Sequence, residues 1–219
     1  MSDGHVDVLV VVGSPEPSST ALVRRLADGA QLVVACDRGA DVLHAAGVVP
    51  DAFYGDADTV SAEALAWLEE AGVSLVRFNP LKDDTDLDLA LDDVRQRMPG
   101  ARVTLTCACG GRPDHQLVVV GSLLRHADLR PVVIEDDLEC HVLSPGGAPT
   151  WELEGSACGR SFSAVCFDRD TVISERGMQW EVDYLRLEPL SGHGLSNVVT
   201  TDDARVTCHE GVLAAFLRA

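Results

Sequence analysis

LVVACDRGADVLHAAGVVPDAFYGDAD, residues 32–58, contains a complete strand–helix–strand unit. An apolar run at Leu32–Cys36 is followed by a helical pattern over 39–46, by Gly47 where a helix cap belongs, and by a second apolar run at Ala52–Tyr54. Parallel strands need a crossover of this kind, and it is usually a helix. The stretch therefore predicts a parallel sheet with covering helices.

The same alternation runs from the start of the chain to about residue 136. Strands are expected at Val8–Val12, Leu32–Cys36, Ala52–Tyr54, Leu75–Phe78, Arg102–Cys107 and Val132–Glu135. Helices are expected near 19–28, 39–46, 60–71, 84–98 and 114–126. The helix over 84–98 has the clearest pattern, because Leu87, Ala90, Leu91, Val94 and Met98 form one apolar stripe.

The pattern changes after residue 136, where long helical periodicity is absent. Short strands are expected at Glu139–Leu143, Ser161–Phe167, Thr171–Ser174, Gln179–Val182, Tyr184–Leu187, Val198–Thr200, Arg205–Cys208 and Val212–Leu217. The predicted fold class is α/β: a parallel-sheet three-layer α/β domain over 1–136, then an antiparallel β-sandwich or barrel domain over 137–219.

Composition excludes several classes of protein. The formal charge of −18 argues against a nucleic-acid partner, since such binding rests on Lys and Arg. No apolar run approaches the length of a membrane span, and Met1-Ser2-Asp3-Gly4-His5 lacks the basic start of a signal peptide. We expect a cytoplasmic protein with no membrane partner. A phosphate-bearing substrate would need a divalent cation to offset the negative charge.

Four loops carry acidic or glycine-rich residues directly after predicted strands: 37–40, 55–58, 82–86 and 110–115. The carboxyl ends of parallel strands meet at one edge, so these loops are expected to form one cleft. Each loop alone also has an ordinary interpretation as a helix cap, as dipole complementarity or as a tight turn.

The residue types in these loops indicate phosphate and metal chemistry. Asp56 and Asp58 are spaced to coordinate magnesium, whereas a cap needs only one carboxylate. Lys82 is unfavourable at a helix N-terminus unless it faces phosphates, and Arg112 offers a forked phosphate donor. The chain has no dinucleotide-binding glycine motif after its first predicted strand, no P-loop and no nucleophile elbow.

The order of these motifs resembles the thiamine pyrophosphokinase family over most of the chain, from about Val8 to Leu217. The motifs that carry the resemblance are Asp37-x-Gly39-Ala40, Pro50-Asp51, Gly55-Asp56-x-Asp58, Lys82-Asp83-x-Thr85-Asp86, Gly110-Gly111-Arg112-x-Asp114-His115, Gly177-Met178-Gln179-Trp180, Gly194-Leu195-Ser196-Asn197 and Glu210-Gly211-Val212-Leu213.

The resemblance implies transfer of the pyrophosphoryl group of ATP to the hydroxyl of thiamine, with thiamine bound at the interface of a homodimer. It implies that Asp56, Asp58 and Asp86 hold Mg²⁺, with Asp83 beside them. The residues implied to hold ATP are Asp37, Lys82, Asp83, Gly110, Gly111 and Arg112, and Asp114 joins the three metal-binding aspartates as a catalytic residue. Trp180, Ser196 and Asn197 would contact thiamine.

Four positions depart from the family pattern. Arg38 stands where a glycine is common, Ala57 where an aromatic residue is common, Thr59 where serine is usual, and Val119 where asparagine is frequent. Two other functions stay open: a pyrophosphokinase for another alcohol, such as a hydroxymethyl-dihydropterin, and a non-catalytic regulator that binds thiamine or a nucleotide.

Overall fold

The computed structural model describes residues 5–77 and 84–219, which fall into two compact units. The first unit comprises Met1–Ser122 with Val133–Asp136, and the second comprises Leu123–Val132 with Asp137–Ala219. Within the described residues, no helix has the length and apolar character needed to cross a bilayer. The assignment of separate catalytic and thiamine-binding domains stays a prediction.

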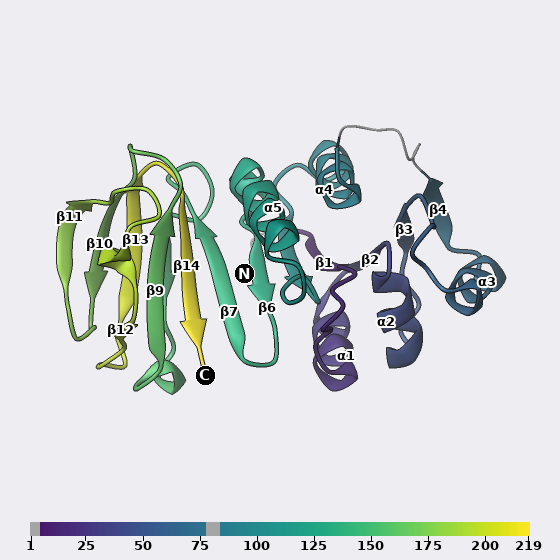
Figure 1. Cartoon of the computed structure of the whole chain (residues 1–219), viewed down its shortest axis with the longest axis horizontal. Helices are drawn as coiled ribbons and strands as arrows, with labels where there is room; N and C mark the ends of the chain where they lie inside the picture. Colours follow the sequence, from purple (N-terminus) through teal and green to yellow (C-terminus); the bar gives the residue numbers. More distant parts are fainter. Residues whose placement is uncertain (1–4, 78–83) are drawn as a thin grey trace. The chain divides into compact units, whose positions relative to one another are not determined.

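The first unit alternates strands and helices along the chain, as the sequence predicted (Figure 1). Its elements are β1 (Asp7–Val11), α1 (Thr20–Gly29), β2 (Leu32–Cys36), α2 (Gly39–Ala46), β3 (Ala52–Gly55), α3 (Ala62–Glu70), β4 (Ser74–Arg77), α4 (Asp86–Arg97), β5 (Arg102–Thr106), α5 (Pro113–Arg125) and β6 (Val132–Ile134). Strand β5 ends before Cys107 because that residue has φ 55°, outside extended geometry. Phe78, expected at the end of β4, lies outside the described residues.

The strands of this unit are ordered β6-β5-β1-β2-β3-β4. Strand β1 pairs in parallel with β2 and with β5, placing Val10 opposite both Val34 and Leu105. Strands β2, β3 and β4 therefore lie on one side of β1, whereas β5 pairs on its other side. The strand order reverses at β1. Ligands of open α/β sheets bind at such a reversal, outside the carboxyl ends of the strands.

Helices cover both faces of this sheet, which gives the three layers predicted. Alternate strand residues such as Val11 and Phe53 pack in one buried cluster with Leu43 of α2 and Leu68 of α3. Helices α4 and α5 lie on the opposite face from α1 and α2 (Figure 1). The predicted stripe of α4 is confirmed at Leu87, Ala90, Leu91 and Val94, all of which are buried.

The second unit contains two antiparallel sheets with a shared apolar core, so the predicted sandwich is confirmed. Its strands are β7 (Leu138–Leu143), β8 (Thr150–Glu152), β9 (Ser161–Cys166), β10 (Val172–Arg176), β11 (Val182–Arg186), β12 (Asn197–Val198), β13 (Arg205–Glu210) and β14 (Leu213–Arg218). The neighbour orders are β12-β9-β14-β7 and β11-β10-β13-β8. Three short 3₁₀ helices accompany these strands: η1 (Ala127–Leu129), η2 (Gly155–Ala157) and η3 (Gly192–Gly194). Strand β8 was not expected, and β11 replaces the two strands expected over 179–187.

Candidate functional site

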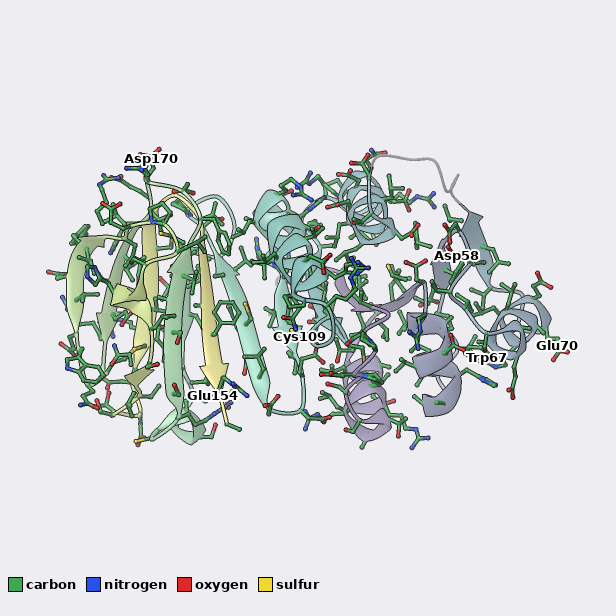
Figure 2. The ribbon with its side chains drawn as sticks, viewed as in Figure 1. Asp58, Trp67, Glu70, Cys109, Glu154 and Asp170 are labelled. Carbon is green, nitrogen blue, oxygen red and sulfur yellow. The ribbon has the colours of Figure 1, made fainter. Side chains whose placement is uncertain are left out.

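The turn after β3 brings two carboxylates together. The Oδ1 atom of Asp56 accepts a hydrogen bond from the backbone N–H of Asp58 at 3.0 Å, which closes a short turn. Ala57, between them, has φ 65°, a left-handed conformation that is strained for a residue with a Cβ atom. This turn therefore keeps Asp56 and Asp58 close together beyond the end of β3. Figure 2 shows Asp58 in this turn.

A third carboxylate belongs to the same cluster. The pKa of Asp58 is raised above its ordinary value, chiefly by a side-chain hydrogen bond with Asp56 and then by the negative charge of Asp56. Asp86 raises it further through its own charge. Three like charges close enough to perturb one another form a setting that a bound cation would stabilise.

The start of α4 fixes Asp86. Thr85 is the N-cap residue, and its hydroxyl oxygen accepts a hydrogen bond from the backbone N–H of Asp88 at 3.1 Å. The same hydroxyl donates to the carboxylate of Asp88 at 2.8 Å. Asp86 is the first residue of α4, so the capped first turn fixes the position of its backbone.

Asp37 follows β2 in a conformation that few residues adopt. Its φ is 47°, and its backbone N–H donates to the carbonyl oxygen of Tyr54 at 3.0 Å. A Cβ atom added at Gly55 would lie 2.4 Å from Oδ1 of Asp37, which is too close for any real contact. Gly55 therefore leaves room for the Asp37 carboxylate beside the end of β3.

Most of these aspartates line one cavity of 440 Å³ in the first unit. Asp37, Asp56, Asp84 and Asp86 are among its lining residues, with His115 and Val119 of α5, whereas Asp58 is not. Three loops and one helix, distant in sequence, therefore meet at the carboxyl edge of the sheet. The predicted convergence of the acidic loops is found for Asp37, Asp56 and Asp86.

The predicted metal ligands suit one part of a Mg²⁺ coordination shell. Within residues 5–77 and 84–219, no three His, Cys, Asp or Glu side chains are arranged to hold a metal ion by themselves. Magnesium commonly takes only one or two carboxylates, with waters and substrate phosphates completing its shell. The crowding of Asp58 by Asp56 and Asp86 matches that donor set. Lys82 and Asp83, predicted to hold ATP, lie outside the described residues.

The loop after β5 places Arg112 and Asp114 against each other rather than in the cavity wall. The guanidinium Nε of Arg112 donates to Asp114 Oδ1 at 3.1 Å, and a second nitrogen donates to Oδ2 at 2.5 Å. The hydrogen bond from Arg112 lowers the pKa of Asp114 to about 2. A carboxylate with so low a pKa is a weak base, so this pairing disfavours Asp114 as the proton acceptor.

Gly110 and Gly111 shape that loop. Their φ angles are 98° and 73°, which only glycine adopts at low cost. A Cβ atom at Gly111 would lie 2.3 Å from Pro15, so the loop lies directly against the segment that follows β1. Ser14 also donates its hydroxyl hydrogen to the carbonyl oxygen of Cys109.

Glu135 is a supporting residue next to the site that the sequence did not reveal. Its carboxylate, just after β6, accepts hydrogen bonds from the backbone N–H groups of Cys107, Ala108 and Cys109 at 2.9, 2.8 and 3.1 Å. The hydroxyl of Ser18 donates to it at 2.5 Å. Glu135 thus orients the chain that leads into the glycine loop, although the sequence predicted only the end of a strand there.

The residues assigned to thiamine all lie in the second unit. Asn197 is buried, while Trp180 is 57% exposed. Both line a separate cavity of 180 Å³. Ser196 is exposed, has φ 61°, and its backbone N–H donates to the Ser163 hydroxyl oxygen at 3.1 Å.

Comparison with known proteins places the chain in a family. Residues 23–134 match the family model described as thiamin pyrophosphokinase, catalytic domain. The chain belongs to the thiamin pyrophosphokinase family. The matched segment holds every described acidic residue of the larger cavity.

Relatives of this family are similar over most of the chain. A thiamine pyrophosphokinase of Bacillus subtilis is 27% identical over 74% of this chain and 74% of its own length. Thiamine pyrophosphokinase 1 of rice is 23% identical over 72% of this chain, but over only 62% of its own length. The crystal structure of thiamine pyrophosphokinase from Bacillus subtilis superposes with a TM-score of 0.81 at 21% identity, covering 97% of this chain and 99% of that one. The yeast enzyme structure also gives 0.81, at 12% identity, covering 99% and 87%. The fold is therefore that of the thiamin pyrophosphokinases.

Proposed function

We propose that the chain transfers the pyrophosphoryl group of ATP to the hydroxyl of thiamine, which releases AMP and thiamine diphosphate. The observation that carries this proposal is the cavity in which Asp37, Asp56 and Asp86 converge, inside the segment that matches the family model. The family supplies the identity of the two substrates, and the cavity supplies a setting suited to a metal-bound triphosphate.

Asp56, Asp58 and Asp86 would hold Mg²⁺ in this proposal. When bound, the ion supplies positive charge that neutralises the triphosphate in a chain whose formal charge is −18. Lys82, Asp83, Gly110, Gly111 and Arg112 would surround the phosphates, with the backbone of the loop held by Glu135.

The chemistry asks the chain for positioning more than for covalent help. The hydroxyl oxygen of thiamine forms a bond to the β-phosphorus of ATP, and the bond from that phosphorus to the oxygen bridging to the α-phosphorus breaks as AMP leaves. The hydroxyl proton passes to a carboxylate, for which Asp86 is the better candidate because Asp114 is paired with Arg112.

Trp180, Ser196 and Asn197 would contact the aromatic part of thiamine, Asn197 by packing, because the hydrogen bonds of its amide are made within the chain. We also propose that the enzyme is a cytoplasmic homodimer. Sedimentation of the purified chain tests the dimer, and a monomer across the working concentrations of the assay would contradict it.

The direct test is an AMP-release assay with ATP, Mg²⁺ and a series of alcohols. We expect AMP with thiamine and none with a hydroxymethyl-dihydropterin. Release only with the pterin would favour the alternative kinase. Thiamine or nucleotide binding without AMP from any alcohol would favour a regulator.

A further inference from the structure

The smaller cavity of 180 Å³ lies wholly within the second unit, away from the acidic loops in sequence. Its volume corresponds to about six water molecules, which is room for one substituted ring rather than for a nucleotide. Ile173, Val182, Leu185 and Leu187 give it apolar walls. Trp180 supplies an aromatic face at its edge.

Glu175 is an unusual residue in such a wall. It is only 4% exposed, although it carries a carboxyl group and lies on β10, an inner strand of its sheet. Burial raises its pKa to about 7, and the hydrogen bond from Asn197 offsets part of that effect. A buried acid with a perturbed pKa that lines a cavity is a candidate for a functional group.

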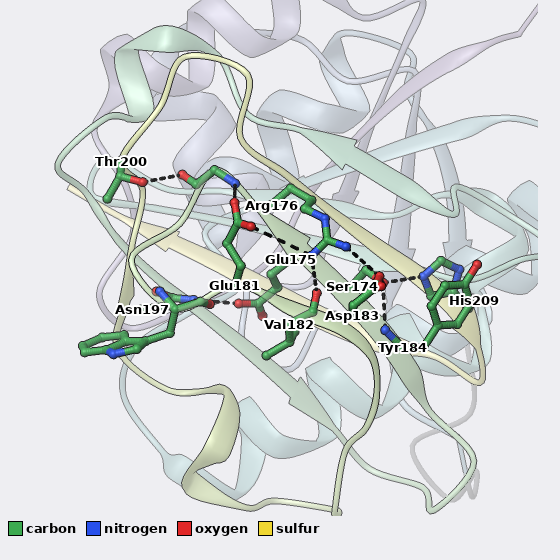
Figure 3. Close-up of polar contacts among 12 residues, drawn as sticks. Ser174, Glu175, Arg176, Glu181, Val182, Asp183, Tyr184, Asn197, Thr200 and His209 are labelled. Atoms are coloured by element: carbon green, nitrogen blue, oxygen red, sulfur yellow. Dashed lines mark hydrogen bonds and ion pairs between the residues drawn. The ribbon is translucent and has the colours of Figure 1, made fainter.

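The two oxygen atoms of Glu175 have different surroundings. Oε2 accepts a hydrogen bond from Nδ2 of Asn197 at 2.7 Å (Figure 3). Oε1 has no hydrogen bond or ion pair with the residues that the structure describes. One acceptor of this buried group is therefore available to a ligand in the cavity.

The side chain of Asn197 has no hydrogen-bonding position left for a ligand. Its Nδ2 donates both hydrogens, one to Glu175 and one to the carbonyl oxygen of Trp180, each at 2.7 Å. Its Oδ1 accepts from the backbone N–H groups of Trp180 at 3.1 Å and Val198 at 2.9 Å. These two acceptances fix the orientation of the amide, so Asn197 must present a donor to Glu175. Asn197 is a positioning residue that links Glu175 to the Trp180 backbone.

We propose that Glu175 is a specificity-determining residue, which accepts a hydrogen bond through Oε1 from the exocyclic amino group of a 4-aminopyrimidine ring in this cavity. The inference rests on the proposed function, because thiamine carries this ring beside its cationic thiazolium. A carboxylate is an acceptor only, so it matches an amino group and not a carbonyl oxygen. The negative charge also favours the neighbouring cation.

The charged groups near Glu175 are few. His193 of η3 is the other titratable side chain that lines the cavity. Arg176 pairs with Asp183 at 2.7 Å and with Glu181 at 4.0 Å, and none of these three residues lines the cavity. Ionisation of Glu175 favours a cationic ligand as pH rises. Because His193 also lines the cavity, the contribution of Glu175 is measured by comparing the wild-type chain with a variant that keeps His193.

The test is calorimetric binding to the full chain without ATP or Mg²⁺, with thiamine and with an analogue whose 4-amino group is replaced by a carbonyl oxygen. The informative variant is Glu175→Gln, which has nearly the same shape. Because Asn197 presents a donor, the new amide must turn its oxygen to Asn197 and its NH₂ group to the cavity. The control is Glu152→Gln on β8, an exposed site with the same change of charge.

We expect wild type and Glu152→Gln to prefer thiamine, with affinity that increases from pH 6 to 8. We expect Glu175→Gln to bind thiamine about tenfold more weakly, to prefer the carbonyl analogue, and to show a smaller pH dependence. A purely structural role would weaken both ligands alike. Equal loss for both ligands, unchanged affinities, or no binding of thiamine to the wild-type chain would each overturn the inference.

The outcome separates this inference from the proposed function. If Glu175→Gln still converts thiamine and still prefers it over the carbonyl analogue as wild type does, the kinase function stands and the proposed role of Glu175 is wrong. Inverted preference without AMP release from the wild-type chain would retain the role of Glu175 and remove the kinase.

Discussion

Two of the cavities in this chain use carboxylates in opposite ways. The larger one, in the first unit, collects Asp37, Asp56, Asp84 and Asp86 from separate loops at the edge of a parallel sheet. The smaller one, in the second unit, holds a single buried acid, Glu175, against apolar side chains. Crowded acids suit a charged, metal-bound ligand, whereas one buried acid with a fixed partner suits discrimination between similar rings. The chemistry of each cavity therefore depends more on what surrounds a carboxylate than on how many carboxylates are present.

The largest expected effect tests the crowded cavity. Asp86→Ala should reduce kcat for AMP release by about 100- to 1000-fold, because it removes charge that stabilises the transition state through the bound cation. Steady-state assays at saturating Mg²⁺ measure it. Asp28→Ala on α1, an exposed site in the same unit, is the control and should retain wild-type turnover. Comparable turnover in both variants would remove Asp86 from the metal site.

The next test concerns pH and stability in the isolated-acid cavity. The pKa of Glu175 rises to about 7 from an ordinary value of 4.5, so between these pH values the folded chain keeps a proton that the unfolded chain has lost. Stability contributed by this residue should therefore fall by about 3 kcal/mol as pH rises from 4.5 to 7. The Glu175→Gln variant has no ionisable group at this position, so its stability should not fall in this way. Urea unfolding at pH 5 and pH 8 measures the free energy of unfolding of both chains. Relative to wild type, the variant should be more stable at pH 8 than at pH 5. The same difference at both pH values would contradict the raised pKa of Glu175.

A smaller effect is expected from the residue that orients the glycine loop. Glu135→Gln should lower the free energy of unfolding by about 1–2 kcal/mol, because an ionised acceptor of three backbone N–H groups is lost. It should also raise the KM for ATP and leave the KM for thiamine unchanged. The neighbouring Asp136→Asn is a matched control, since Asp136 accepts from the backbone N–H and hydroxyl of Ser19 at 2.6 and 2.7 Å. That variant should lose stability without a change in either KM, and a raised ATP KM in both would assign the effect to stability alone.

The smallest expected effect comes from the exposed ion pair beside the cavity. The side chains of Arg112 and Asp114 are 69% and 62% exposed, so Arg112→Gln should leave Tm unchanged. We expect a rise in the KM for ATP of no more than about fivefold. A lower Tm with unchanged KM would show that the pair serves the fold instead of the phosphates.

The first unit could be predicted in detail because its signals are local. The apolar run Leu32–Cys36 and the helical pattern over 39–46 coincide with β2 and α2. The buried stripe of α4 follows directly from its spacing. Since the carboxyl ends of parallel strands share one edge, the convergence of Asp37, Asp56 and Asp86 also followed from their places after strands.

The second cavity could not be predicted in this way. The strand expected over Thr171–Ser174 stopped short of Glu175, because an acid is unfavourable inside a strand. Its burial depends on the packing of β10 between β11 and β13, together with a register shift between Ile173 and Glu175. The role of Asn197 likewise depends on hydrogen bonds with Glu175 and Trp180, far from it in the chain. The sequence pattern contains none of these contacts.

The pairing of Arg112 with Asp114 was also beyond the sequence. Both residues were predicted to face the substrates, and their spacing does not distinguish a ligand contact from a mutual ion pair. The loop conformation set by Gly110 and Gly111 brings the two side chains together.

Glu135 holds the segment Cys107–Cys109 through its main-chain N–H groups. Cys107 and Ala108 are buried in the core, which restricts their side chains, whereas Cys109 is only half-buried and is the position of the three most open to substitution over evolution, provided that the strand carrying the acid stays in register. An engineer who wishes to vary this segment can begin with Cys109 and should leave the glutamate untouched.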